Sequence, residues 1–409
     1  MHGNPFLYLS LIFLAAFLMK ILSRKIKIPE VTGYVIIGVL LGVSLLRILS
    51  PETLHNLSAI STVALGIIAF IIGSELRFST IRKLGKSILF IVVFECLTAF
   101  AVVYGVLLAL VPDKPYMALL LGAVASATAP AATVAVIKQY RTRGELTSTI
   151  MAVVGIDDAL ALVIYVVASG FAKAGLQGQE LHILHILGQV GLSIGESLLI
   201  GIAAAFLYRR LLSHFFRESE WIEILLAAAV LGILGISEFL GNSELLAVMV
   251  FASVVANTAP TLSKRSGQVV DSFSPIFLAA FFILGGAHLD TRVITDIGLI
   301  GLVYFLARSA GKIGGASLGA FVGRAPKKVR GRIGFTLLPQ VGVALALALS
   351  INREFTRPMY GQGGAEMAHY IINILLFTTI ITEVVGPLLT RYQLRRAGEI
   401  DPERITQEV

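Results

Sequence analysis

The sequence predicts an all-α polytopic membrane protein, and three observations point to this fold class. Of the 409 residues, 56% are hydrophobic and only 14% are charged, whereas soluble domains carry about 25% charged residues. Apolar segments of about 20 residues, the length that crosses a bilayer once, recur along the whole chain. Clusters of basic residues separate these segments. The net charge of +8 therefore indicates membrane topology, and we expect no nucleic-acid partner.

Thirteen apolar segments are expected to form spanning helices. The first has no small-residue cleavage site and is followed at once by basic residues, so we interpret it as a span rather than a signal peptide. Several segments contain glycine or proline, which membrane helices tolerate. The predicted spans are 6–22, 30–48, 56–74, 87–111, 116–137, 146–170, 184–207, 221–240, 243–257, 268–288, 295–322, 331–351 and 368–390.

The basic residues predict the orientation of these spans. Of the 33 lysines and arginines, 25 fall in one set of loops and six in the other, while Arg308 and Lys312 lie inside a span. Cytoplasmic loops are enriched in basic residues. We therefore expect the N-terminus outside and the C-terminus in the cytoplasm, and we expect the inner membrane of a prokaryotic cell.

An internal repeat is indicated by FIIGSEL (70–76), which recurs as FILGGAHL (282–289). An odd number of helices separates the two copies, so the second is inserted upside down. Inverted repeats are typical of secondary transporters, with binding sites where paired helices are broken. The prediction is one membrane unit, 1–409, consisting of a first repeat (1–183), a linker helix (184–220), an inverted second repeat (221–390) and a short cytoplasmic tail (391–409).

Two spans carry proline at corresponding positions of the repeats. Pro130 lies between Thr128 and Thr133, and Pro339 precedes Gln340. A proline removes one backbone hydrogen bond and clashes with the carbonyl a turn earlier. The freed carbonyls and the ends of the half-helices can then bind ions.

Adjacent aspartates, Asp157 and Asp158, interrupt an apolar span. A charge at the centre of a spanning helix costs roughly 2.5–3.5 kcal/mol on insertion scales, so a cationic partner, a bound cation or a proton must compensate it. Neighbours on a helix point about 100° apart and cannot share one environment. Arg308 and Lys312, four residues apart on one helical face, are the basic residues at membrane depth, and Lys312 is the deeper.

The charges predict different roles for the two aspartates. One is expected to pair with Lys312, and the other to bind an alkali cation together with Thr128 or Thr133 as neutral oxygen ligands. A carboxylate balanced near neutrality holds either a proton or a cation, which couples the two fluxes. A static ion pair that only joins two helices accounts for Lys312 and one aspartate, but not for the second. Glu95, also mid-span, is a possible additional titrating group.

With these residues in place, the chain resembles the monovalent cation:proton antiporter superfamily, in particular the branch of the NapA-type sodium/proton antiporters and the Kef-type potassium efflux systems. The resemblance extends through both repeats. It is carried by IPEVTGYVIIGVLLG (28–42), FIIGSELRFSTIRKLGK (70–86), ATAPAATVAV (127–136), GIDDALALVIY (155–165), ARSAGKIGG (307–315) and LLPQVGVALAL (337–347).

The resemblance implies a NhaA/NapA-like fold with two crossed discontinuous helices and elevator-type alternating access in a homodimer. It implies an ion-binding core of helices 3–6 and 10–13 and a dimerisation domain of helices 1–2 and 7–9. Asp158 matches the residue that binds the transported Na⁺, and Asp157 matches the partner of Lys312. The double-aspartate form goes with electrogenic exchange of two protons per sodium ion. Many relatives carry an acidic residue just after the helix-12 break, where this chain has Gln340.

A secondary transporter that exchanges Na⁺ for protons, rather than an enzyme, is thus the function that we expect, with the cation and protons as substrates and no cofactor. Two alternatives remain open from the sequence. One is a K⁺/H⁺ antiporter or Kef-like potassium efflux pathway, and the other is an ion-coupled symporter of an organic solute. Channels build filters from rings of carbonyls or acids and need no buried Asp–Lys pair.

Overall fold

The protein is described here by a computed structural model that covers residues 4–26, 30–43, 45–129, 133–134, 136–137, 140–178, 183–215, 219–290 and 294–400. These residues form helices and connecting turns without a β-strand among them, which confirms the all-α prediction. The helices are α1 (Pro5–Ile26), α2 (Glu30–Leu41), α3 (Pro51–Asn56), α4 (Ser58–Glu75), α5 (Phe78–Leu110), α6 (Pro115–Ala125), α8 (Glu145–Leu176), α9 (Ile183–Phe215), α10 (Ser219–Leu240), α11 (Glu244–Thr258), α12 (Pro260–Ala287), α13 (Ile294–Val322), α14 (Lys327–Arg330), α15 (Ile333–Thr336), α16 (Gly342–Phe355), the 3₁₀ turn η1 (Pro358–Tyr360) and α17 (Gly361–Ala397).

Eight helices in the described part of the chain are long and apolar enough to cross a membrane, and three shorter apolar helices accompany them. Large apolar side chains cover much of the outer surface, for example Phe6, Leu199 and Phe239, of which Phe239 is 88% exposed. Apolar surface of this extent marks contact with lipid rather than water. The protein is therefore a membrane-spanning helical protein, while the count of thirteen spans stays a prediction.

Local sequence signals account for several helix ends. Pro115 and Pro260 stand in the first turns of α6 and α12, where a missing N–H costs nothing. The Ser243 side chain accepts a hydrogen bond from the backbone N–H of Leu246 and thereby caps α11. At the other end, α17 stops at Gly398, whose φ of 72° suits a residue without a Cβ atom.

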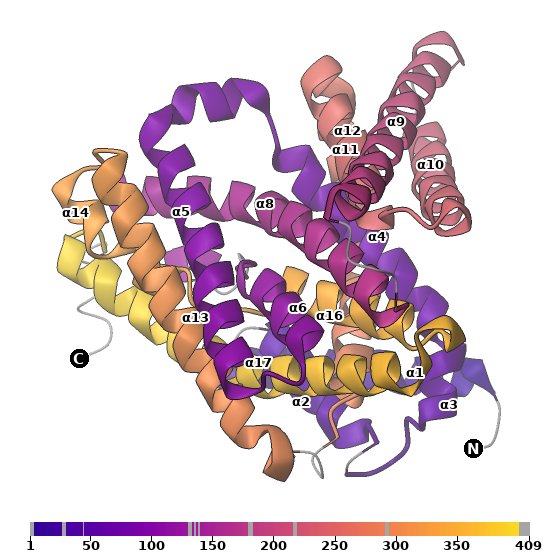
Figure 1. Ribbon diagram of the computed structural model, residues 1–409. Helices are drawn as coiled ribbons and strands as arrows, with labels where there is room; N and C mark the ends of the chain where they lie inside the picture. Colours follow the sequence, from indigo (N-terminus) through magenta and orange to yellow (C-terminus); the bar gives the residue numbers. More distant parts are fainter. Residues whose placement is uncertain are drawn as a thin grey trace.

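The helices pack in two groups, which we call bundle A (α5, α6, α8 and α13–α17) and bundle B (α1–α4 and α9–α12). In bundle A, α13 packs along α5, and α17 packs on α13 and α16; in bundle B, α11 packs on α4 and α9, and α12 on α2 and α4. Figure 1 shows α13 and α14 on one side of the molecule and α9 and α10 on the other.

Bundle membership differs from the expected core at two helices. The predicted spans 56–74 and 268–288 were expected in the ion-binding core, and they correspond to α4 and α12. Both helices pack mainly within bundle B. The division of the chain into an ion-binding core, a dimerisation domain and two inverted repeats stays a prediction.

A row of glycines brings α13 unusually close to α5. Gly311, Gly315, Gly319 and Gly323 recur every four residues and so lie along one helical face. A Cβ atom added at Gly315 would lie 2.6 Å from Phe94 O and 2.9 Å from Glu95 Cα, and the other three glycines meet the α5 backbone similarly. Small residues at such spacing allow membrane helices to touch along their backbones. This contact sets the distance between the charged side chains of the two helices.

Candidate functional site

Two interrupted helices meet in the interior of bundle A. The helical conformation of α6 stops at Ala125 and residues 126–129 are not helical; likewise, residues 337–341 separate α15 from α16. The backbone N–H of Ala129 donates to Pro339 O at 2.8 Å, so the two breaks are in direct contact. Figure 1 shows α6 and α16 close to one another near the centre of the molecule. Pro130 lies outside the described residues.

Thr133 and Thr336 form a second link between the breaks. The Thr133 hydroxyl donates to Thr336 O at 3.0 Å, and both side chains are fully buried. Because this hydroxyl already serves a backbone carbonyl from the other interrupted helix, its observed contact is structural. Thr128, the other predicted neutral ligand, faces the charged residues instead.

Arg308 holds the two broken helices together through their free carbonyls. Its guanidinium donates from Nε to Ala125 O at 3.2 Å, from Nη2 to Ala127 O at 2.8 Å and from Nη1 to Leu338 O at 2.7 Å. The side chain is fully buried. Carbonyls at the end of a helix carry partial negative charge, which a cation there neutralises. Arg308 is thus bound by backbone carbonyls, and Lys312, which the sequence favoured as the partner of an aspartate, lies near the carboxylates.

Lys312 lies among four oxygen atoms, and its nearest carboxylate is Glu95. Its Nζ is 2.6 Å from Glu95 Oε2 and 3.9 Å from Asp157 Oδ2. It donates hydrogen bonds to Ser126 O at 2.5 Å and to Thr128 Oγ1 at 2.8 Å. Lys312 therefore lies near both Glu95 and Asp157, with Glu95 as the closer of the two.

Asp157 and Asp158 occupy different environments, as their neighbouring positions on α8 require. Asp158 Oδ1 accepts the backbone N–H of Thr128 at 3.3 Å, at the break after α6. Neither Oδ atom of Asp157 accepts a hydrogen bond within the described part of the chain. Both side chains are buried, with 0% of Asp157 and 3% of Asp158 exposed. Two buried carboxylates with so few donors need protons or a cation as compensation.

Gln340 at the break before α16 and Glu383 of α17 are two further buried polar residues. The Gln340 side-chain amide donates to Val124 O at 3.2 Å and to Tyr304 Oη at 2.8 Å. Glu383 of α17 is buried and accepts from the hydroxyl of Thr32 on α2 at 3.2 Å. Glu383 was not among the site residues expected from the sequence. The sequence signal for Glu383 was an acidic residue in the final predicted span, next to a broken helix that has Gln340 where many relatives have an acid.

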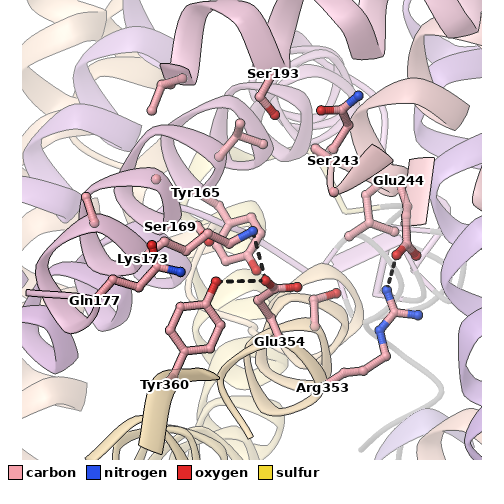
Figure 2. Close-up of a pocket in the computed structure, with 18 residues that line it drawn as sticks. Tyr165, Ser169, Lys173, Gln177, Ser193, Ser243, Glu244, Arg353, Glu354 and Tyr360 are labelled. Carbon is pink, nitrogen blue, oxygen red and sulfur yellow. Dashed lines mark hydrogen bonds and ion pairs between the residues drawn. The ribbon is translucent and has the colours of Figure 1, made fainter. Parts of the chain in front are cut away.

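A cavity of about 310 Å³ lies where α8 and α16 of bundle A meet α9 and α11 of bundle B. Its wall includes Tyr165 and Ser169, which are seven and eleven residues beyond Asp158 on the same helix. Seven residues span about 10 Å of helix axis and bring the chain back to nearly the same face. Figure 2 shows two ion pairs at this cavity, Lys173 with Glu354 and Arg353 with Glu244.

Comparison with known proteins supports one family. The family model described as "Sodium/hydrogen exchanger, transmembrane" matches residues 13–393, so the chain belongs to the sodium/hydrogen exchanger family, within the monovalent cation:proton antiporter superfamily. Its members are transporters, which confirms that the protein is a cation/proton exchanger of this family rather than an enzyme.

Individual relatives agree with this assignment. The chain is 23% identical over 391 residues to a Na(+)/H(+) antiporter of Enterococcus hirae, covering 94% of this chain and 96% of the relative. It is 24% identical over 422 residues to cation/H(+) antiporter 19 of Arabidopsis thaliana, covering 96% of this chain but only half of the plant protein. Among solved structures, the sodium proton antiporter MjNhaP1 of Methanocaldococcus jannaschii shares the fold, with a TM-score of 0.78 at 18% identity, and the match covers 96% of this chain and 98% of that one.

Proposed function

We propose that this protein exchanges Na⁺ for protons, and that Asp158 is the residue that binds the transported ion. One observation carries the proposal: a buried carboxylate at the break after α6, held by a single backbone N–H, beside a second carboxylate that accepts no hydrogen bond among the described residues. Such a pair needs positive charge from outside the protein. Thr128 contributes a hydroxyl and a backbone N–H on the same side. The name of the bacterial relative supports Na⁺ as the cation.

Competition for one site couples the two ions. When Asp157 and Asp158 are both protonated, the pair carries no charge; when they release both protons and bind one Na⁺, the pair and its ion carry a charge of −1. Each exchange then moves two protons one way and one sodium ion the other way, so one net charge crosses the membrane. Exchange is therefore electrogenic, and a membrane potential drives it.

The transport movement is proposed to be an elevator-like displacement of bundle A against bundle B. Both broken helices, Asp157, Asp158 and Lys312 belong to bundle A, so the whole site can move as one body. Bundle B, with its apolar exposed side chains on α9 and α10, provides the scaffold and the surface of a homodimer. Thr133, Pro339 and Gln340 maintain the crossing of the broken helices.

The orientation proposal follows the basic loops: the N-terminus outside and the C-terminus in the cytoplasm of a prokaryotic cell. A cysteine placed at Lys327, the first residue of the short basic helix α14, should react with a membrane-impermeant thiol reagent only in inside-out vesicles. Labelling of intact cells at this position would reverse the orientation.

Flux measurements in proteoliposomes test the proposed exchange. A Na⁺ pulse should dissipate an imposed pH gradient, and Asp158→Asn should abolish this response. Asp113→Asn, which changes an exposed aspartate in the turn before α6, serves as the matched control and should retain it. Normal exchange by Asp158→Asn would remove Asp158 from the site.

The same vesicles distinguish the alternatives of cation and mechanism. K⁺ or Li⁺ pulses identify the preferred cation, and a potassium-specific response would favour the potassium exchanger or efflux pathway. Cation flux that needs an organic solute on the same side would favour a symporter. Exchange that ignores an imposed membrane potential would contradict the electrogenic stoichiometry.

A further inference from the structure

Lys312 lies closer to one carboxylate than to the other. An ammonium group has three N–H donors, and two of them serve Ser126 O and Thr128 Oγ1. Beyond these hydrogen bonds, Nζ forms ion pairs with Glu95 Oε2 at 2.6 Å and Asp157 Oδ2 at 3.9 Å, and neither oxygen accepts a hydrogen bond among the described residues. The nearer carboxylate gains more Coulomb energy, because attraction between unit charges falls as the inverse of distance.

Backbone packing fixes the distance between Glu95 and Lys312. Gly315, three residues after Lys312 and hence on the same side of α13, places its Cα against the backbone of Phe94 and Glu95. A side chain at this position would force the two helices apart. The contact between α5 and α13 therefore brings Glu95 to Lys312 independently of the position of α8, which carries the aspartates.

We propose that Glu95 is the positioning residue that holds Lys312, and that it thereby leaves Asp157 accessible to the transported ions. This rests on the proposed exchange at Asp158. With Arg308 engaged by three backbone carbonyls, Lys312 is the cation nearest the two aspartates. If Glu95 did not hold Lys312, the ammonium would move toward Asp157 and compete there with the substrate cation.

Double-mutant cycles on thermal unfolding of the detergent-solubilised protein test the pairing without a transport assay. The single variants are Glu95→Gln, Lys312→Gln and Asp157→Asn, with the two doubles that contain Lys312→Gln. We expect Glu95→Gln and Lys312→Gln to be strongly non-additive, with the double variant no less stable than the worse single variant. The effects of Asp157→Asn and Lys312→Gln should be closer to additive. Stronger coupling to Asp157 than to Glu95 would overturn the proposal.

Transport kinetics give a second readout that a merely structural role would not move. Glu95→Gln should raise the apparent KM for Na⁺ at least threefold while Vmax per folded protein stays within about twofold, and Glu95→Asp should lie between. If Glu95→Gln yields no folded protein, Glu95→Asp carries both tests. A loss of Vmax at unchanged KM would contradict the positioning role. Absence of exchange in the unmodified protein would refute the proposed function instead.

A second inference comes from the ion pairs at the cavity in Figure 2. Arg353, near the end of α16 in bundle A, pairs with Glu244 of α11 and donates to Thr62 of α4, both in bundle B. The Lys173–Glu354 pair at 3.0 Å lies in the same cavity but joins α8 to α16 within bundle A. One cavity thus holds one ion pair that crosses between the bundles and one that does not.

We infer that Arg353 and Glu244 form an ionic latch between the bundles at this end of the molecule, and that transport requires it to open. Glu244 is 9% exposed and Arg353 is 30% exposed, so water screens the pair only in part. Any movement of bundle A along bundle B separates these two residues, whereas Lys173 and Glu354 travel together. This inference rests on the proposed movement of the bundles.

Crosslinking tests the latch against its matched control. Cysteines replace Arg353 and Glu244 in one variant and Lys173 and Glu354 in the other, and a short bis-methanethiosulfonate joins each pair through two disulfides that a reductant cleaves. We expect the cross-bundle link to lower Na⁺/H⁺ exchange at least tenfold, with recovery after cleavage, and the link within bundle A to leave exchange within twofold. Undiminished exchange with a complete cross-bundle link would overturn the latch.

Charge variants then test the ionic nature of the latch. Glu244→Gln should change the exchange rate by about two- to fivefold, and the exchanged pair Glu244→Arg with Arg353→Glu should restore it. Glu354→Gln, the control within bundle A, should have a smaller effect. The latch would be refuted if Glu244→Gln left the transport rate unchanged and the charge-swapped double variant did not transport at the rate of the unmodified protein. That outcome would leave the proposed Na⁺/H⁺ exchange itself intact.

Discussion

Replacing Arg308 with leucine removes the cation that joins the two broken helices. Its guanidinium donates to three buried carbonyls, those of Ala125, Ala127 and Leu338, at 2.7–3.2 Å. A buried acceptor left without a partner costs roughly 1–3 kcal/mol, so three of them cost about 3–9 kcal/mol. Part of this is offset because a buried charge, which costs several kcal/mol to desolvate, is removed at the same time. We expect a net loss of about 3 kcal/mol.

Thermal unfolding of the detergent-solubilised protein measures this loss. For a cooperative unit of about 200 residues, roughly the size of bundle A, 1 kcal/mol shifts the midpoint of unfolding by about 2 °C. The midpoint should therefore fall by roughly 6 °C in Arg308→Leu. Arg308→Lys keeps the charge but lacks the planar fork that reaches three acceptors, so its midpoint should lie between. Arg332→Leu is the matched control, because the Arg332 guanidinium donates to Lys328 O at an exposed helix end. A midpoint for Arg308→Leu equal to that of the control would refute the assigned role.

Four further outcomes are expected. Gly315→Leu should strongly reduce the yield of folded protein, because a Cβ atom there lies 2.6 Å from a backbone oxygen. Gly314→Ala should be tolerated, because a Cβ atom at Gly314 would have nothing within 4 Å. Equal yields of the two variants would contradict the packing argument. Thr133→Val removes the hydrogen bond to Thr336 O and should lower the free energy of unfolding by about 1 kcal/mol. Thermal unfolding measures this loss, and an unchanged midpoint would show that the bond is dispensable. Asp157→Asn should leave exchange that no longer responds to membrane potential, and a retained voltage response in vesicles would refute the stoichiometry. Because protons and Na⁺ compete for the same carboxylates, the apparent KM for Na⁺ should rise as the pH falls, and a KM independent of pH would argue for separate sites.

The broken helices illustrate what a sequence pattern can predict. Pro339 and the Thr128–Thr133 segment indicated two interruptions because proline cannot continue the helical hydrogen bonding. Residues 126–129 and 337–341 are indeed not helical. No local rule, however, states that the two breaks touch, or that the Ala129 N–H donates to Pro339 O. That contact depends on the packing of segments about 200 residues apart.

Glu95 illustrates what the sequence left undecided. Charge counting identified Lys312 and an aspartate as partners, since both lie at membrane depth. It could not rank Glu95 against Asp157, because the distances of 2.6 and 3.9 Å follow from the approach of α13 to α5. The glycines at four-residue spacing in 311–323 were the available signal for that approach.

The sequence by itself determined the class of this protein: a helical membrane protein of the cation/proton exchanger superfamily, with an expensive pair of buried aspartates at its centre. The helical membrane class and the buried pair follow from hydrophobicity, spacing and charge, which are local properties of the chain, and the superfamily follows from the resemblance of its sequence stretches. The tertiary structure decided which charges meet, because Arg308 and Lys312 lie one turn apart on the same face yet serve different partners, one the backbone carbonyls of the breaks and the other Glu95. Distances of 2.6 and 3.9 Å separate the closer partner of Lys312 from the farther one, and only the folded chain defines distances on that scale.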